Sequence, residues 1–479
     1  MMDSRLSARS LETLLGPWRT REPAYEAIAD SVRLLCLDNR IAPRTALPAE
    51  RELATRLGVS RTTVAAAYRS LRDSGHIESL RGSGSVTLPL GGSAPGRFSA
   101  DEGVIDLQQA SPSAWPGLAG AYAEAAGRTA SLVTRTGYDV VGRSGLREAI
   151  AAHYATRGLP TTSAQIMVTN GAQSAISLVA SLFVSRGDRV VIETPTYPHA
   201  ADAFRGCGAR LVGVPVVSGH GWDLERADHA FRRAVPTAAY LMPDFQNPTG
   251  GSMSAAERVA FAEAARQVGA TLIIDETTAE LGIDRPETHP PFAATAAGVG
   301  GVSIVTIGSL GKTVWGGLRV GWIRAEIDTI RRLVAARTAF DLGTPEFEQA
   351  VAEQLFPQMP GILTQRSGLL REGRDAAVET LAERLPAWDV PRVHGGVSLW
   401  VGLGEPLSSS LVMTARRRGL LLSAGPRFAV DGGHERHIRI PFTVSRHTME
   451  RAVDILADAW ADLAQGVPLE GVEPLSSVI

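Results

Sequence analysis

Five short, continuously apolar runs in the middle of the chain constrain its fold more than any other feature. Stretches with helical patterning separate these runs, which span residues 165–170, 188–195, 237–243, 270–276 and 302–309. A strand that is apolar along its whole length is buried on both faces, as strands of parallel sheets are. The pattern therefore predicts an α/β domain whose mostly parallel sheet is covered by helices on both faces.

A change of composition divides the chain of 479 residues into a small part and a large one. Residues 89–103 are rich in glycine, proline, serine and alanine, which is the composition of a linker. We therefore expect an N-terminal extension (1–21), a small helical domain (22–88), the linker, and a large domain (104–479) that contains the five apolar runs.

Several classes of protein are excluded by what the sequence lacks. No apolar run reaches the roughly 18–20 residues that span a bilayer, and the N-terminus has no apolar segment typical of a signal peptide. Cys36 and Cys207 lie far apart and near no histidine cluster, so neither a disulfide framework nor a metal site is expected. These observations favour a cytoplasmic protein without a membrane partner.

The small domain has the charge and the helical pattern of a DNA-binding module. Residues 40–81 contain eight arginines and four acidic residues, although the net charge of the whole chain is −2. Two short helices follow each other there, with Gly58 placed to end the first and Ser60 to cap the second. This is a helix-turn-helix pattern. Two strands are expected after it, and they turn at Arg81-Gly82 to form a wing.

Residues of roughly 22–88 resemble the winged helix-turn-helix of GntR-type regulators. The resemblance implies that operator DNA is contacted by motif arginines, by hydroxyls at the start of the second helix and by the wing. The residues concerned are Arg51, Ser60, Arg61, Thr62, Thr63, Arg81 and Gly82. The alternative is a small helical cap whose arginines serve only solubility.

Lys312 is the one lysine among the 48 basic residues of the chain. A coding bias toward arginine explains the count, and so does chemistry that needs an amine able to lose its proton, which arginine cannot do. The lysine follows the apolar run 302–309 and is flanked by Ser309 and Arg319, whose side chains suit a phosphate. A lysine beside a phosphate site is the arrangement that pyridoxal phosphate requires.

Other segments supply the remaining groups that this cofactor needs. Asp275 ends an apolar run, where its carboxylate can keep a pyridinium nitrogen protonated. Asn247 can donate to the phenolic oxygen, and Tyr197 can lie flat on the ring. Ala172 and Gln173 begin a predicted helix, so their backbone amides would point at a phosphate. The combination predicts pyridoxal 5'-phosphate as the cofactor.

Residues of about 104–465 resemble the fold-type I aminotransferases, with Lys312 at the position of the cofactor aldimine. The resemblance implies that Tyr138 reaches the phosphate of the neighbouring subunit and that Arg439 grips a substrate α-carboxylate in a bidentate fork. One position departs from the family. The tyrosine usually found two or three residues after the aspartate is absent, and Thr277 or Thr278 stands there instead.

The two halves together resemble the MocR group of GntR-family transcriptional regulators. The resemblance implies a head-to-tail, domain-swapped homodimer that reads a repeated operator. It also implies an effector that is an amino acid, an amine or pyridoxal phosphate itself, held by Arg439 if it has a carboxylate. Two alternatives stay open: an active aminotransferase with an accessory DNA-binding domain, and a regulator whose large domain no longer binds the cofactor.

Overall fold

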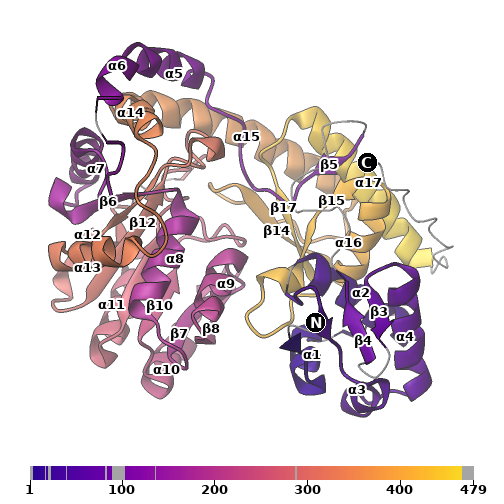
Figure 1. Cartoon of the computed structure of the whole chain (residues 1–479). Helices are drawn as coiled ribbons and strands as arrows, with labels where there is room; N and C mark the ends of the chain where they lie inside the picture. The colour runs from indigo at the N-terminus through magenta and orange to yellow at the C-terminus, as the bar shows by residue number, and fades with distance from the viewer. Residues whose placement is uncertain are drawn as a thin grey trace.

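The computed structural model describes residues 4–16, 18–19, 23–38, 40–80, 84–88, 103–134, 136–285 and 289–465. A small N-terminal domain lies beside the C-terminal part of a larger body (Figure 1). Most of the predicted linker and the predicted wing residues Arg81 and Gly82 lie outside the described residues. Of the helices described, none is long and apolar enough to cross a membrane.

The N-terminal domain packs its helices around a small sheet of strand order β1-β2-β4-β3. Its elements are β1 (Ser4–Arg5), α1 (Ala8–Leu15), α2 (Ala24–Leu37), β2 (Thr45–Ala46), α3 (Glu50–Leu57), α4 (Arg61–Asp73), β3 (Ile77–Leu80) and β4 (Gly84–Thr87). Gly58 ends α3 in the left-handed conformation (φ 65°), and Ser60 caps α4 by accepting a hydrogen bond from the Thr63 amide. The predicted helix-turn-helix is confirmed, and the antiparallel pair β3 and β4 forms the two strands of a wing.

The large domain is built on an eight-stranded sheet of order β6-β13-β12-β11-β10-β7-β8-β9. Its strands are β6 (Ile166–Thr169), β7 (Arg189–Thr194), β8 (Arg210–Val217), β9 (Gly221–Trp222), β10 (Ala238–Leu241), β11 (Thr271–Asp275), β12 (Ser303–Ser309) and β13 (Gly321–Arg324). The five predicted apolar runs form β6, β7, β10, β11 and β12. The mostly parallel sheet is confirmed, with β13 antiparallel to β6 and β12 and β9 antiparallel to β8.

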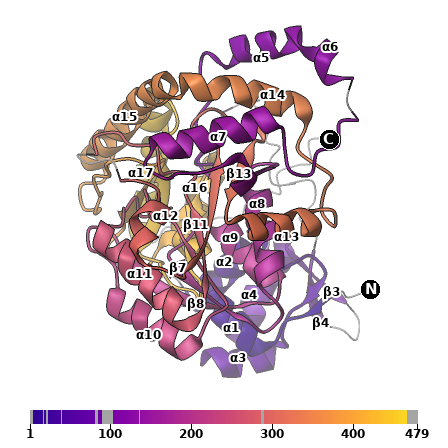
Figure 2. The same ribbon diagram turned by 90° about the vertical axis from the view of Figure 1, so that its left-hand side faces the viewer.

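Helices cover both faces of this sheet (Figures 1 and 2). One face carries α8 (Ala172–Phe183), α9 (Pro198–Gly206) and α13 (Ile327–Arg337), and the other carries α10 (Leu224–Ala234), α11 (Ala255–Val268) and α12 (Phe292–Thr295). Val190 and Ile192 of β7 pack in the core with α8, whereas Val191 between them packs in the core with α10. Because side chains alternate between faces, burial of both faces explains why the strand is a continuous apolar run.

The remaining elements of the large domain lie around this sheet. The remaining helices are α5 (Leu118–Gly127), α6 (Thr129–Leu132), α7 (Ser144–Thr156), α14 (Glu346–Leu355), α15 (Met359–Arg384), α16 (Ser408–Arg417) and α17 (Arg446–Gln465). The remaining strands are β5 (Ile105–Asp106), β14 (Ser398–Gly402), β15 (Leu420–Leu421), β16 (Ser423–Ala424) and β17 (His437–Pro441). Of these, α15, α16, α17 and β14 to β17 form a smaller C-terminal subdomain with one hydrophobic core. Single turns of 3₁₀ helix are η1 (Ser163–Gln165), η2 (Ala296–Gly298), η3 (Gly316–Leu318), η4 (Phe356–Gln358) and η5 (Gly425–Phe428).

The N-terminal domain packs against this C-terminal subdomain. Leu34 of α2 belongs to the same hydrophobic core as Leu411 of α16, and Nη1 of Arg40 donates a hydrogen bond to the carbonyl oxygen of Pro426 at 3.1 Å. This contact is made within one chain, whereas the resemblance implied exchange of the DNA-binding domain between two chains. The exchange stays a prediction.

Candidate functional site

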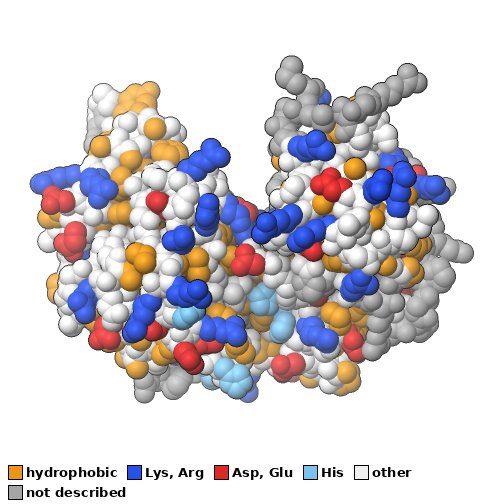
Figure 3. Space-filling view, turned by 90° about the horizontal axis from the view of Figure 1, so that it is seen from below, with side chains coloured by type: hydrophobic (Ala, Val, Ile, Leu, Met, Phe, Trp, Pro, Cys, Tyr) orange, Lys and Arg blue, Asp and Glu red, His pale blue; other side chains and the backbone are white. Residues whose placement is uncertain are grey.

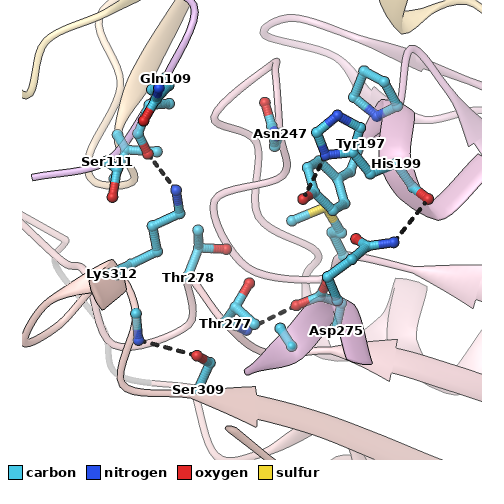
Figure 4. Close-up of a pocket in the computed structure, with 18 of the residues that line it drawn as sticks. Gln109, Ser111, Tyr197, His199, Asn247, Asp275, Thr277, Thr278, Ser309 and Lys312 are labelled. Carbon is cyan, nitrogen blue, oxygen red and sulfur yellow. Dashed lines mark hydrogen bonds between the residues drawn. The ribbon is translucent and has the colours of Figure 1, made fainter. Parts of the chain in front are cut away.

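A cavity of about 430 Å³ lies between the large sheet and the C-terminal subdomain. It gathers nine residues that were predicted from the sequence, and Figure 4 shows several of them: Ala172, Gln173, Tyr197, Asn247, Asp275, Ser309, Lys312, Arg319 and Arg439. The strands β11 and β12 are parallel neighbours that end at Asp275 and Ser309. Because parallel strands end at the same edge of a sheet, the segments that follow them meet at this cavity.

Lys312 presents a buried amine to the cavity. Its Nζ donates a hydrogen bond to the carbonyl oxygen of Ala110 (Figure 4). Burial lowers the pKa of Lys312 to about 8, and the positive charge of Arg439 adds to the decrease while Asp275 opposes it. An amine with this pKa is partly unprotonated near neutral pH, which is the form that attacks a carbonyl carbon.

Asp275 is the last residue of β11 and is almost completely buried. Its Oδ2 accepts a hydrogen bond from the Tyr240 hydroxyl at 2.5 Å, and its Oδ1 accepts one from the Thr277 amide at 2.9 Å. Burial raises the pKa of Asp275, and these donors oppose the rise because they stabilise the carboxylate. The two hydrogen bonds fix the direction in which the carboxylate faces the cavity.

Groups suited to an anion surround the N-terminal end of α8. Gly171 precedes the helix with φ 83°, and Nη2 of Arg319 donates to the Asn170 carbonyl oxygen at 2.8 Å beside it. Ser309 is the last residue of β12, and its Oγ accepts a hydrogen bond from the Gly311 amide at 3.0 Å. Free backbone amides, the helix dipole, a guanidinium and a hydroxyl together make a phosphate site.

Polar atoms of three pocket residues are buried without a hydrogen-bond partner among the described residues. They are Oδ1 of Asn247, Oε1 of Gln173 and Nε of Arg439. An unsatisfied buried polar atom costs about 1–3 kcal/mol, so these atoms fit a pocket that binds a polar molecule. Tyr197 lies at the same cavity with its hydroxyl 3.1 Å from Nδ1 of His199, and burial raises the pKa of Tyr197 to about 12.

Arg439 comes from β17 of the C-terminal subdomain, on the opposite side of the cavity from the sheet. Its Nη2 donates to the carbonyl oxygen of Gln108, and its guanidinium lies 4.9 Å from the centre of the Phe428 ring. Burial lowers the pKa of Arg439 to about 10. A desolvated guanidinium of this kind gains strongly from a carboxylate partner.

The two threonines that replace the usual tyrosine have different environments. The hydroxyl of Thr278 donates to the carbonyl oxygen of Asp244 at 2.8 Å and is buried. Thr277 also lines the cavity, and its backbone amide donates to Asp275. The Thr278 hydroxyl is therefore held by a backbone carbonyl, whereas the Thr277 side chain lies in the cavity against the Asp275 carboxylate.

The structure also brings residues to the cavity that were not predicted from the sequence. Those with polar side chains are Gln108, Gln109, Ser111, His199, Ser423 and Arg427. His199 stands two residues after Tyr197 in the first turn of α9, so its spacing from the predicted aromatic residue was an available signal. The others have no local pattern that marks them.

Tyr138 does not line the cavity of its own chain. It is 73% exposed, and a β-bridge between Asp139 and Gly343 holds its segment beside Leu342, which is also exposed.

The DNA-binding residues predicted for the helix-turn-helix lie on its exposed side. Ser60, Arg61 and Thr62 at the start of α4 are exposed, and Thr63 is half-buried. The Oγ atom of Ser60 is 2.7 Å from the hydroxyls of both threonines. Arg51 on α3 is exposed as well. The Arg61 side chain is 72% exposed with its Nε 3.6 Å from Glu50 Oε2, a surface pair that holds it only weakly.

Residues 119–456 match the family described as aminotransferase class I and II. The chain belongs to this family. Residues 24–86 match a second family, described as bacterial regulatory proteins of the gntR family. The aminotransferase family implies pyridoxal 5'-phosphate as the cofactor, as predicted, and the GntR family implies DNA as a partner. In the part of the chain that is described, no group of His, Cys, Asp and Glu side chains could hold a metal ion.

Relatives of this chain include proteins that are named as regulators. The chain is 27% identical to a Bacillus subtilis protein named uncharacterized HTH-type transcriptional regulator YdfD, over 83% of this chain and 87% of that protein. It is also 27% identical to the probable rhizopine catabolism regulatory protein MocR of Rhizobium meliloti, over 63% of this chain and 65% of that protein. The predicted resemblance to MocR-type regulators is confirmed.

The large domain is also similar to solved aminotransferase structures. One is LysN, the α-aminoadipate aminotransferase of Thermus thermophilus, in a complex with N-(5'-phosphopyridoxyl)-L-leucine. The TM-score is 0.69 and the identity 27%, over 76% of this chain and 94% of that one. The fold expected for residues 104–479 is thus that of this family.

Proposed function

We propose that the protein is a DNA-binding transcriptional regulator whose aminotransferase-like domain binds pyridoxal 5'-phosphate at Lys312 and senses an amino acid, an amine or the cofactor itself. One observation carries the proposal. The buried Lys312 amine, with its lowered pKa, shares a pocket with Asp275, and the same chain carries an exposed helix-turn-helix. Two of the relatives are named as regulators, which supports the proposal.

The pocket residues fit this cofactor. Its phosphate would lie at the start of α8, where the amides of Ala172 and Gln173, the Ser309 hydroxyl and the Arg319 guanidinium converge. Asp275 would hold the ring nitrogen. The buried amide group of Asn247 would serve the phenolic oxygen, and Tyr197 would lie against the ring. In this assignment the Nδ2 group of Asn247 donates to the phenolic oxygen. The unsatisfied Nε of Arg439 supports an anionic ligand in the same pocket, because a carboxylate would accept from it.

When bound, pyridoxal 5'-phosphate supplies a carbonyl that reacts with primary amines and a ring that withdraws electrons. Lys312 supplies the amine in the resting protein, because burial keeps a useful fraction of it unprotonated. Lys312 would hold the cofactor, and Arg439 would bind the carboxylate of an effector that has one.

Effector binding has a direct route to the DNA-binding domain. Lys312 donates to the carbonyl oxygen of Ala110, and Arg439 donates to that of Gln108. Both donors therefore hold the segment that follows β5, where the chain enters the large domain from the linker. Binding of the cofactor at Lys312 and of an effector carboxylate at Arg439 would change these contacts, and the change shifts the DNA-binding domain if affinity for the effector differs between the two arrangements.

The exposed start of α4 is the proposed DNA-reading surface. The hydroxyls of Ser60, Thr62 and Thr63 and the guanidinium of Arg61 lie at a helix N-terminus, which attracts phosphate. Arg51 would add a further contact. Arg81 and Gly82 of the wing, which lie outside the described residues, stay predicted contacts.

We place the regulator in the cytoplasm, where its DNA is, as a homodimer. The exposure of Tyr138 supports the dimer, since a tyrosine that serves its own chain would not lie 73% exposed. Leu342, beside the Tyr138 segment, is an exposed apolar side chain as well, and apolar side chains exposed together mark an interaction surface. In the dimer Tyr138 would reach the phosphate site of the partner. Exchange of the DNA-binding domains would keep the contacts of α2 with the C-terminal subdomain but make them between the two chains, and it would leave two half-sites for a repeated operator.

An active aminotransferase is the second candidate, favoured by the complete pair of Lys312 and Asp275. The absence of the usual tyrosine and the engagement of the Thr278 hydroxyl with Asp244 favour the regulator instead. A threonine hydroxyl is far less acidic than a phenol, so the phenolic oxygen of the cofactor would be less well stabilised as an anion.

The proposal is tested with purified protein and the DNA upstream of its own gene. We expect a yellow protein that loses its colour on Lys312→Ala and that shifts this DNA in a gel. A panel of amino acids and amines should include a compound that changes both the absorbance and the DNA affinity. Multiple turnovers with an amino acid and a keto acid would favour the enzyme, and failure to bind DNA would reject the regulator.

A further inference from the structure

A second cavity, of about 900 Å³, lies between the N-terminal domain and the large domain. The N-terminal domain lines it with Leu14, Leu37, Asp38 and Arg40, and the large domain with Asp106, Asp202 and Arg205. It shares a wall with the Lys312 pocket, made by five residues that line both cavities: Gln108, Gln109, His199, Ser423 and Arg427. Figure 3 shows acidic and basic side chains side by side on the face of the molecule where the two lobes meet.

Arg427 is the charged residue of this shared wall. It belongs to η5, next to Pro426, whose carbonyl oxygen accepts the hydrogen bond from Arg40. Its side chain is 10% exposed, and its Nη2 donates to Oδ2 of Asp202 at 2.8 Å. Among the described residues, Nη2 is the one atom of this guanidinium with a protein acceptor, so further N–H groups remain for an anion.

The neighbours of Arg427 in the shared wall are neutral donors and acceptors. His199 is among them, and burial together with Arg427 lowers the pKa of that imidazole, which favours its neutral form. Arg427 lines the same pocket as Lys312 and Arg439, so a ligand bound in that pocket has this wall beside it. Of the five residues of the shared wall, Arg427 is the one cation and none is a carboxylate, and a buried guanidinium binds a carboxylate better than a neutral group of the same size. Asp202 pairs with Arg427 from the side of the second cavity.

We propose that the effector is an α-amino acid with a second, distal carboxylate, and that Arg427 binds this carboxylate at the wall between the two cavities. The inference rests on the proposed function, which leaves the chemical class of the effector open. It makes Arg427 a specificity-determining residue, and the distal carboxylate competes with Asp202 for the guanidinium.

The position of Arg427 also connects this recognition to the DNA-binding domain. Burial raises the pKa of Asp38, at the end of α2, and the positive charges of Arg427 and Arg40 oppose the rise. Asp38 is therefore within the electrostatic reach of Arg427 across the domain boundary. A ligand carboxylate on Arg427 weakens that attraction and disturbs the η5 segment that accepts the Arg40 hydrogen bond.

The effector class is tested by titrating the cofactor-loaded protein with two pairs of amino acids of matched length. The pairs are L-glutamate with L-glutamine, and L-2-aminoadipate with L-norleucine, and the change in cofactor absorbance gives the affinity. We expect at least one acidic member to bind about tenfold or more tightly than its neutral partner, as a hydrogen bond to a charged group implies. Equal affinities within both pairs would overturn the inference and leave the proposed function standing.

Arg427→Gln should abolish the preference for the acidic member. Arg205→Gln is the matched control, because Arg205 also pairs with Asp202 and lines the second cavity but is absent from the Lys312 pocket. The control should keep the preference, and persistence of the preference in Arg427→Gln would overturn the assignment. If none of the four amino acids changes the absorbance or the DNA affinity, this inference fails, while DNA binding and the wider panel of amino acids and amines still decide the proposed function.

Asp38→Asn tests the connection to DNA. This variant should bind the acidic amino acid with unchanged affinity, while the effect of that amino acid on DNA affinity becomes several-fold smaller. Undiminished coupling in Asp38→Asn would exclude Asp38 from the route, and thermal unfolding of the variant checks that the domain remains folded.

Discussion

Arg319 reaches the N-terminal end of α8 because residue 171 is a glycine. A Cβ atom on Gly171 would lie 2.8 Å from Nη2 of Arg319 and 3.1 Å from its Cζ, so the guanidinium would have to move. We expect Gly171→Ala to lower the affinity for pyridoxal 5'-phosphate by about tenfold or more, the loss expected when a charge-assisted hydrogen bond to phosphate is removed. Titration of the apoprotein with the cofactor, followed by absorbance, measures the effect.

Gly158→Ala is the control for the backbone. Gly158 has φ 85°, close to the 83° of Gly171, but a Cβ there would meet nothing within 4 Å. Both substitutions carry the strain of a left-handed alanine, about 1–2 kcal/mol, and only Gly171→Ala displaces Arg319. Equal cofactor affinities in the two variants would contradict the role of Arg319 at the phosphate.

The lowered pKa of Lys312 predicts how cofactor binding depends on pH. Only the unprotonated amine reacts, so below the pKa the rate of cofactor capture should rise about tenfold per pH unit and level off above it. With a pKa of about 8 the plateau should begin near pH 8, and not near 10.5, the ordinary value for lysine. Stopped-flow absorbance of the apoprotein mixed with the cofactor over this range measures the plateau.

A substitution of Arg439 tests what lowers the pKa of Lys312. Its positive charge is one of the two influences that lower the pKa of Lys312. Arg439→Gln removes that charge, so the protonated amine is less disfavoured and the plateau should move to higher pH. A plateau that stays in place would assign the whole decrease to burial.

The hydrophobic pattern predicted the strands that are buried on both faces, since burial leaves a local trace in the sequence. It did not predict β8 or β13. Residues of β8 are only partly buried over much of its length, and it contains Gly213 and Pro215, which interrupt an apolar run. β13 is four residues long, and its reversed direction depends on its neighbours and not on its own residues.

The residues of the site also divide into those that a local sequence pattern predicted and those that it did not. Asp275 ends β11 and Lys312 lies shortly after the end of β12, so a local pattern placed them at one edge of the sheet. Arg427 and Gln108 come from η5 and from the segment after the linker, far from each other in the chain. They meet because the C-terminal subdomain packs on the sheet, and no spacing in the sequence reports that contact. The different environments of Thr277 and Thr278 likewise appear only in the structure.

Thr277 and Thr278 should respond differently to the loss of the hydroxyl. Thr278→Val leaves the buried carbonyl of Asp244 without its donor, so we expect the free energy of unfolding to fall by about 1–3 kcal/mol. Thr277→Val should affect stability less and shift the absorbance or the pKa of the bound cofactor. Thermal unfolding and a spectral pH titration of both variants separate the effects. A spectral change confined to Thr278→Val would reverse the assignment.

Arg61 should contribute directly to DNA affinity. Its side chain is exposed in the first turn of α4, and the surface pair with Glu50 is too weak to keep the guanidinium from contacting DNA. Arg61→Ala should weaken specific binding by about 1–3 kcal/mol if the guanidinium contacts a base edge. Arg69→Ala, in the second half of the same helix, removes the same charge away from the helix N-terminus and should have a smaller effect. Fluorescence anisotropy with operator DNA compares them, and equal losses would indicate a nonspecific effect of charge.

Tyr138 should act across the dimer, since it is exposed in its own chain and absent from its own pocket. Tyr138→Phe should weaken cofactor binding by about 0.5–1.5 kcal/mol, the usual contribution of one hydrogen bond. Mixing this variant with Lys312→Ala chains provides a stricter test. A heterodimer then has one site in which Lys312 of one chain and Tyr138 of the other are both intact, and that site should bind the cofactor with the affinity of the unaltered protein. If the mixture binds no more tightly than Tyr138→Phe alone, Tyr138 does not serve the partner's site.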